Sequence, residues 1–74
     1  MNNDRRKTIS QQIFAVEDVL SRLQETLEAE QEAFDNMPEN LQNSERGETM
    51  SENISSLENA VSSLESALED LGSL

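Results

Sequence analysis

The sequence predicts an all-α protein: an antiparallel two-helix hairpin of the coiled-coil type that pairs into a four-helix bundle or a larger homo-oligomer. Apolar residues recur at alternating intervals of three and four in both halves of the chain, and one short segment around Pro38 interrupts them. With 74 residues and neither cysteine nor histidine, the chain lacks disulfides and thiolate or imidazole metal sites. Of the common ways to stabilise so small a protein, oligomerisation is left.

The first helix is predicted at about residues 4–34. Its apolar stripe consists of Ile9, Ile13, Val16, Leu20, Leu23 and Leu27, and the same steps lead on to Glu30 and Phe34. Glu30 therefore falls on the stripe. In one interpretation it lies at the end of the bundle and pairs with Arg46, which the hairpin brings alongside. In the other it fixes the register or contacts a ligand.

The second helix is predicted at about residues 45–72. Here the stripe is a literal heptad repeat, because Ile54-Ser-Ser-Leu-Glu-Asn-Ala60 is followed by Val61-Ser-Ser-Leu-Glu-Ser-Ala67 and then by Leu68-Glu-Asp-Leu71. A single hairpin buries each stripe on one side only, so a second copy is expected to cover the rest. The residues expected at the centre of the oligomer core are Ile13, Leu20, Leu27, Phe34, Ile54, Val61 and Leu68.

The connection is predicted at residues 35–44, with a short helical turn at 38–41. Pro38 cannot continue the first helix, and Ser44 is a good N-cap for the second. Gly47 is either a weak spot in that helix or a place where another backbone comes close. Gly72 ends the pattern. A connection this short folds two matched helices back on each other, so residues 1–74 form a single domain.

The charge pattern restricts the possible partners. Sixteen acids and five bases give a formal charge of −11, and from Thr8 onward the chain has 15 acids and two bases. Such a surface repels nucleic acid and anionic membranes and favours a basic protein partner; solubility alone explains it equally well. No secretory signal or membrane span is recognisable, so we expect a cytoplasmic protein without direct nucleic-acid binding.

Catalysis is not expected. Without histidine, cysteine or tyrosine, acid–base or nucleophilic chemistry would fall to carboxylates or an unassisted serine. The acids near the connection miss the spacing of a calcium loop. We therefore expect neither a catalytic residue, nor a metal site, nor a cofactor.

Candidate partner-binding residues are those that fit a simple bundle poorly. Acids gather at the end of the first helix, where they oppose the helix dipole, and Phe14 lies off the apolar stripe. A solvated surface is the alternative for the acids, and self-association is the alternative for Phe14. The candidates are Phe14, Glu25, Glu28, Glu32, Asp35, Asn36 and Arg46.

The only basic cluster is Arg5, Arg6 and Lys7. In an antiparallel hairpin it lies beside the end of the second helix, where cations suit the helix dipole. Alternatively, several copies of the cluster hold an anionic ligand.

The stretch Glu32-Ala-Phe-Asp-Asn-Met-Pro-Glu-Asn-Leu-Gln-Asn-Ser-Glu-Arg-Gly-Glu48, followed by Leu-Glu-Ala heptads, resembles a group of small acidic proteins of phages, prophages and bacterial mobile elements. The resemblance covers about residues 5–71. It implies a setting in a bacterial host cell and an accessory or counter-defence role, but no mechanism. The residues that it points to are Phe34, Asp35, Asn36, Pro38, Leu41, Ser44, Arg46 and Gly47, which physics alone would accept as a well-specified turn.

Three functions remain as hypotheses. The first is a self-associating protein that binds a host or phage protein and modulates or inhibits it through its acidic surface and loop. The second is a counter-defence protein that sequesters a nucleotide-like signal between subunits. The third is an acidic mimic of DNA.

Overall fold

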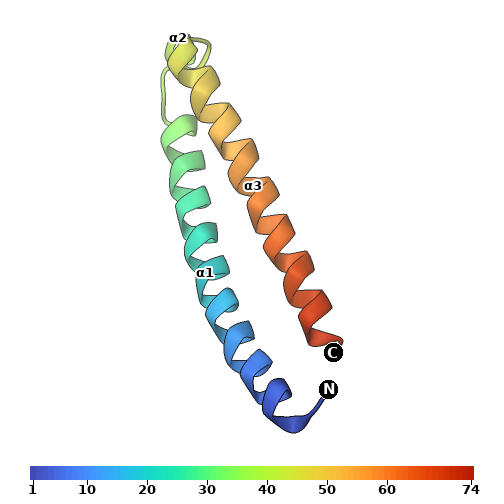
Figure 1. Cartoon of the computed structure of the whole chain (residues 1–74). Helices are drawn as coiled ribbons and strands as arrows, with labels where there is room; N and C mark the ends of the chain where they lie inside the picture. Colours follow the sequence, from blue (N-terminus) through green and yellow to red (C-terminus); the bar gives the residue numbers. More distant parts are fainter.

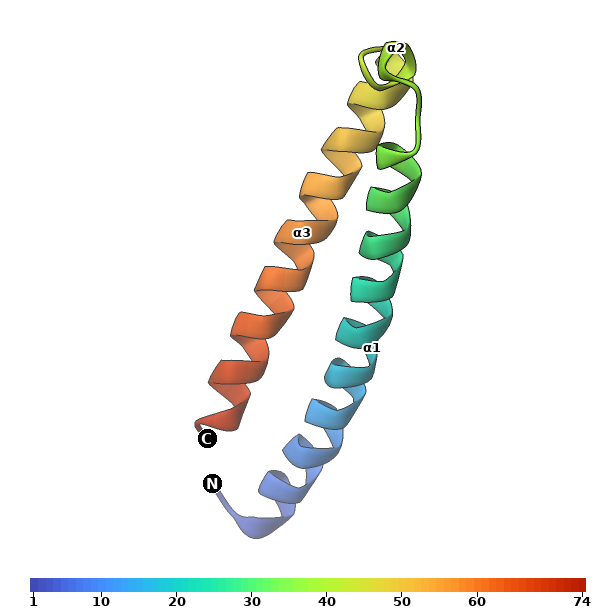
Figure 2. The ribbon, with the colours of Figure 1, turned by 180° about the vertical axis from the view of Figure 1, so that it is seen from behind.

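The computed structural model describes residues 1–74 and shows an elongated helical hairpin (Figure 1). Helix α1 spans Asn3–Asp35, the one-turn helix α2 spans Glu39–Gln42, and α3 spans Glu45–Gly72. The molecule measures 58 × 15 × 13 Å, with α1 packed against α3. Both chain ends lie at one end of the hairpin and α2 lies at the other, as the view from behind also shows (Figure 2). The predicted all-helical hairpin is confirmed.

Local side-chain signals set the helix boundaries. Asn2 caps α1, because its side-chain oxygen accepts a hydrogen bond from the backbone N–H of Arg5 at 2.9 Å. Ser44 caps α3 in the same way, accepting from the N–H of Gly47 at 3.3 Å. Pro38, with its fixed φ, follows the end of α1 and precedes α2.

The packed seam follows the heptad pattern but is only partly covered. In the whole chain only Gly47, Ile54 and Val61 are buried, with Ile54 5% and Val61 8% exposed. The other seam residues of both helices are half-buried; they are Ile9, Ile13, Val16, Leu20, Leu23, Leu27, Glu30, Phe34, Met50, Leu57, Leu64, Leu68 and Leu71. One hairpin therefore leaves most of its apolar stripe partly open to solvent.

The loop end is held by a side-chain hydrogen bond and by a close backbone approach. The side-chain amide of Gln42 donates to the backbone carbonyl oxygen of Phe34 at 2.9 Å, which ties α2 to the end of α1. A Cβ on Gly47 would lie 2.1 Å from the carbonyl oxygen of Gln42 and 2.4 Å from that of Leu41. Of the two interpretations of Gly47, the close approach of another backbone is the one that the structure shows.

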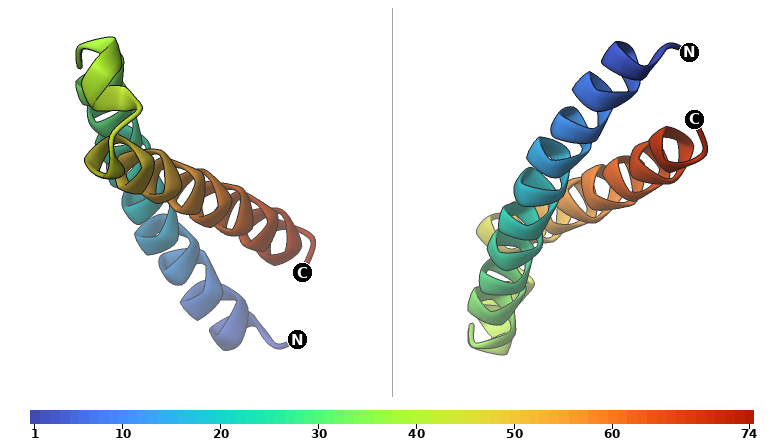
Figure 3. Two further views of the ribbon diagram at one scale, coloured as in Figure 1. Left: turned by 90° about the horizontal axis from the view of Figure 1, so that it is seen from above. Right: turned by 90° about the horizontal axis from the view of Figure 1, so that it is seen from below.

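At the terminal end of the hairpin, Arg6 joins α1 to the residue that ends the chain after α3. Its guanidinium donates to the carbonyl oxygen of Leu74 at 2.9 Å and to that of Met1 at 3.4 Å, across a small cavity of 170 Å³. End-on views show α1 and α3 diverging from the loop end towards the termini, which this contact spans (Figure 3). Arg6 of α1 thus links the start of the chain to Leu74, which lies just beyond the end of α3.

None of the three helices contains a segment with the length and apolar character that crossing a membrane requires.

Candidate partner-binding surfaces

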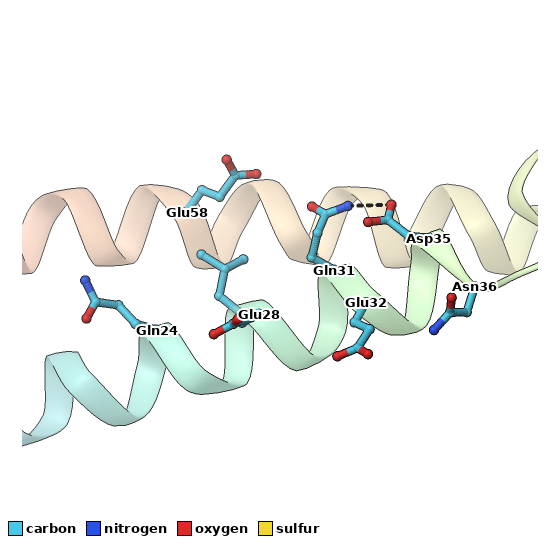
Figure 4. A pocket seen from close by; sticks show the side chains of 8 residues that line it. Gln24, Glu28, Gln31, Glu32, Asp35, Asn36 and Glu58 are labelled. Carbon is cyan, nitrogen blue, oxygen red and sulfur yellow. Dashed lines mark hydrogen bonds between the residues drawn. The ribbon is translucent and has the colours of Figure 1, made fainter.

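An acidic groove runs along the last three turns of α1 (Figure 4). It has a volume of 670 Å³. Its lining consists of Gln24, Leu27, Glu28, Gln31, Glu32, Asp35 and Asn36 from α1 and its C-cap, together with Glu58 from α3. Four carboxylates and three side-chain amides thus surround one apolar residue, and no base is among them.

The groove's charge is not neutralised within the chain. The last turn of α1 contains no basic residue, so Glu32 and Asp35 add to the negative end of the helix dipole. Asp35 accepts one hydrogen bond, from the amide of Gln31 at 3.0 Å. The only ion pair of the protein joins Asp18 and Arg22 at 3.1 Å, outside the groove, and both side chains are largely exposed. The groove is therefore suited to a cationic group from another molecule.

The structure brings together four of the seven candidate partner-binding residues: Glu28, Glu32, Asp35 and Asn36. Glu25, Phe14 and Arg46 do not line the groove. Sequence reasoning missed Gln24, Gln31 and Glu58. The first two follow Glu17 at heptad spacing, and Glu58 directly follows the seam residue Leu57, so the flank of the repeat carried a signal that could have identified them.

The heptad repeat divides the hairpin into two sides with different charge. The flank that includes the groove, here called the acidic side, carries Glu17, Gln24 and Gln31 of α1 and Ser51, Glu58 and Glu65 of α3. In an antiparallel pair, equivalent flanks of the two helices lie on the same side of the seam. The opposite flank, here called the neutral side, carries Gln12, Val19, Thr26 and Ala33 of α1 and Asn53, Ala60 and Ala67 of α3. No residue of that set is charged, and Val19 is 49% exposed.

Phe14 is 73% exposed, which agrees with its place off the stripe. Its neighbours one turn away on α1 are polar or charged: Ser10, Gln11, Glu17 and Asp18. Phe14 is thus a single exposed aromatic side chain and not part of a larger apolar patch.

The basic cluster does not converge on one point. Successive residues of a helix point about 100° apart, so Arg5, Arg6 and Lys7 face three directions. Arg6 is already engaged by the carbonyl oxygens of Leu74 and Met1. The cavity at this end is lined by Arg6 but not by Arg5 or Lys7, so the three bases of a single chain do not form one anion pocket.

The expected ion pair between Glu30 and Arg46 is wrong. Glu30 is half-buried on the seam and Arg46 is exposed, but no ion pair joins them. The positions differ in kind, because Glu30 lies on the seam five residues before the end of α1, whereas Arg46 lies on the exposed surface of the first turn of α3. The interpretation that Glu30 fixes a register or contacts another molecule stays open.

No group of three or more carboxylates is arranged to hold a metal ion. Comparisons with protein-family models, with curated proteins and with solved structures found no match.

Proposed function

We propose that the chain is a non-catalytic binding protein that self-associates through its apolar seam and engages a positively charged protein surface through the acidic groove. The observation that carries the proposal is the groove, which Glu28, Glu32, Asp35 and Glu58 line without a neutralising base. In the setting that the loop resemblance implies, the partner is a host or phage protein, which the binding modulates or inhibits.

Self-association is supported by the small core. Three of 74 residues are buried, and the remaining seam residues are half-exposed. Full burial of a large apolar side chain contributes about 1.5–3 kcal/mol, so most of that contribution is not realised in one hairpin. A second hairpin against the seam supplies the missing burial.

The absence of catalysis is part of the proposal. The sequence contains no histidine, cysteine or tyrosine, and its single lysine, Lys7, lies in the first turns of α1, far from the groove. Carboxylates and amides alone can attract and position a cation, but they offer no nucleophile that an adjacent base activates.

A second candidate function, mimicry of nucleic acid, is supported by the charge density of α1. Five acids lie between Glu25 and Asp35, a rise of about 15 Å, which gives one charge per about 3 Å. One DNA strand carries a phosphate about every 3.4 Å. A basic nucleic-acid-binding protein would be the partner in that case.

Sequestration of an anionic ligand by Arg5, Arg6 and Lys7 has less support. Arg6 is engaged within the chain, and the three side chains diverge.

The test compares capture of partners by two variants of equal net charge. In the groove variant, Glu28→Gln and Glu32→Gln remove two carboxylates from the groove; in the control, Glu52→Gln and Asp70→Asn remove two from the outer face of α3. Tagged proteins are incubated with lysate of a bacterial host, washed with rising salt and analysed by mass spectrometry.

We expect a protein that wild type and control retain and the groove variant loses, eluting as salt screens the charges. Equal retention by both variants would contradict the role of the groove, and the absence of any specific protein would contradict the binding function. Displacement of the partner by duplex DNA would favour the mimic.

A further inference from the structure

The neutral side of the hairpin is the surface along which a second copy can approach without charge repulsion. Along α1 the positions Gln12, Val19, Thr26 and Ala33 carry no charge, and the same heptad position contains Arg5 at the terminal end. Along α3, Asn53, Ala60 and Ala67 are uncharged, and Arg46 precedes them at the loop end. The acidic side repels its own copy, because contact would bring Glu17, Glu58 and Glu65 against the acidic side of the partner.

Charge is also distributed unevenly along the length of the hairpin. Three of the five bases are Arg5, Arg6 and Lys7 at the terminal end. Nine of the 16 acids lie between Glu25 and Glu52, around the loop end. The terminal end also carries Asp4, Glu69 and Asp70, so its formal charge is about zero. Two copies side by side in the same direction place two acidic loop ends together, whereas two copies in opposite directions place each acidic loop end beside a terminal end that carries the bases.

We propose that two copies pack neutral side to neutral side in opposite directions, with α1 against the α1 of the partner, so that Arg5 of each copy pairs with Glu30 of the other. The proposal rests on the self-association proposed above and specifies its surface and direction. Both residues lie on one face of α1, since 25 positions at 100° per residue leave them about 20° apart. In this arrangement Glu30, half-buried and without an ion-pair partner in its own chain, obtains a guanidinium.

In this dimer the α1 helices of the two copies overlap along almost their whole length. Pairing Arg5 with Glu30 places the twofold axis midway, at about position 17.5, and the middle of the helix Asn3–Asp35 is residue 19. Val16 of one copy then lies level with Val19 of the other. Both are apolar, so the centre of the contact is apolar and its two ends are charged.

The surface offered by one side of the hairpin is large enough for a stable dimer. Its outline is 58 × 15 Å, so full contact over that side would cover at most about 870 Å² of each copy, or about 1,700 Å² in total. Stable protein interfaces bury about 1,200–2,000 Å² in total. Ala33, Ala60 and Ala67 have short side chains that let the backbones of two hairpins come close.

The ion pair is tested by charge reversal, with association measured by analytical ultracentrifugation. We expect Arg5→Glu and Glu30→Arg each to weaken dimerisation about tenfold, because each variant places two pairs of like charges in the symmetric dimer. The double variant restores the pairs with opposite polarity and should return to within about threefold of wild type. Glu25→Arg, on the outer face of α1, is the control and should leave dimerisation within about threefold of wild type.

The relative direction of the two copies is tested by measuring the distance between their loop tips. Because the chain has no cysteine, Asn40→Cys places one spin label on each loop tip, away from the proposed contact. For opposite directions, electron–electron double resonance should give about 50 Å between the labels, close to the 58 Å length of one hairpin.

A distance below about 30 Å would overturn the proposal and indicate parallel copies, in which the two loop tips lie side by side. Failure of the double charge reversal to restore association would also overturn it. Either result leaves self-association intact, whereas a monomer at all concentrations would refute the self-association on which the proposal rests.

Discussion

Gly47 should be the residue of α3 that least tolerates a methyl group. Its Cβ would lie 2.1 Å from the carbonyl oxygen of Gln42 and 2.5 Å from the carbonyl carbon of the same residue. These are backbone atoms, so no side-chain rotation relieves the overlap. In Gly47→Ala, α2 must move away from α3 by about 1 Å or more to restore ordinary contact distances.

The loss of stability in Gly47→Ala follows from the contacts that this movement of α2 disturbs. On an open helix, Gly→Ala stabilises by about 1 kcal/mol through helix propensity. Overpacking against a fixed neighbour costs about 1–3 kcal/mol, and loss of the Ser44 cap costs about another 1 kcal/mol. We therefore expect Gly47→Ala to lower the free energy of unfolding by about 2 kcal/mol, which for a domain of this size is a fall in Tm of about 8–16 °C.

Gly72→Ala is the matched control, because no atom lies within 4 Å of the added Cβ. It should leave Tm unchanged or raise it slightly. Unfolding is followed by circular dichroism at one fixed protein concentration, since association makes Tm depend on concentration. Equal Tm values for the two variants would refute the close approach of α2 to α3.

Three further substitutions test the rest of the hairpin. Ile54→Ala removes the most buried apolar side chain and should cost about 2–4 kcal/mol in a denaturant titration, whereas a loss below about 1 kcal/mol would mean that the seam is not the core. Gln42→Ala removes the side-chain donor to the carbonyl oxygen of Phe34, which keeps the N–H of Met37, and we expect a loss of about 0.5–1.5 kcal/mol, with unchanged stability as the contradicting result. Arg6→Ala should speed amide hydrogen exchange in the last turn of α3 while exchange around Ile54 stays as in wild type; equal exchange at both places would disprove the link to Leu74.

The heptad pattern was enough to predict the two long helices and the residues that pack in the seam where the helices meet. Every seam position from Ile9 to Leu71 is buried or half-buried, because a sustained 3–4 spacing places one face of each helix against the other. The N-cap Ser44 was predicted too, since a cap is a local interaction between a side chain and the next turn.

Contacts between the two helices were harder to predict. The pairing of Glu30 with Arg46 was wrong because it depended on how α1 and α3 align across the connection, and no single helix encodes that alignment. Glu58 was overlooked as a groove residue for the same reason: it lines the groove with the acids of α1 only once the flanks of both helices lie on one side. The role of Gly47 was left between two alternatives until the position of α2 was known.

The heptad repeat of α1 and α3 has a consequence for the lengths that such hairpins can have. Ile13 lines the terminal cavity together with Leu71, and Leu27, two heptads further along α1, lines the groove together with Glu58, so the packing recurs about every seven residues in both helices. Removing one block of seven from each helix would bring the tip and the termini about 10 Å closer and leave the chemistry of both ends intact. Viable insertions and deletions in this architecture should therefore occur as paired heptads, one in each arm.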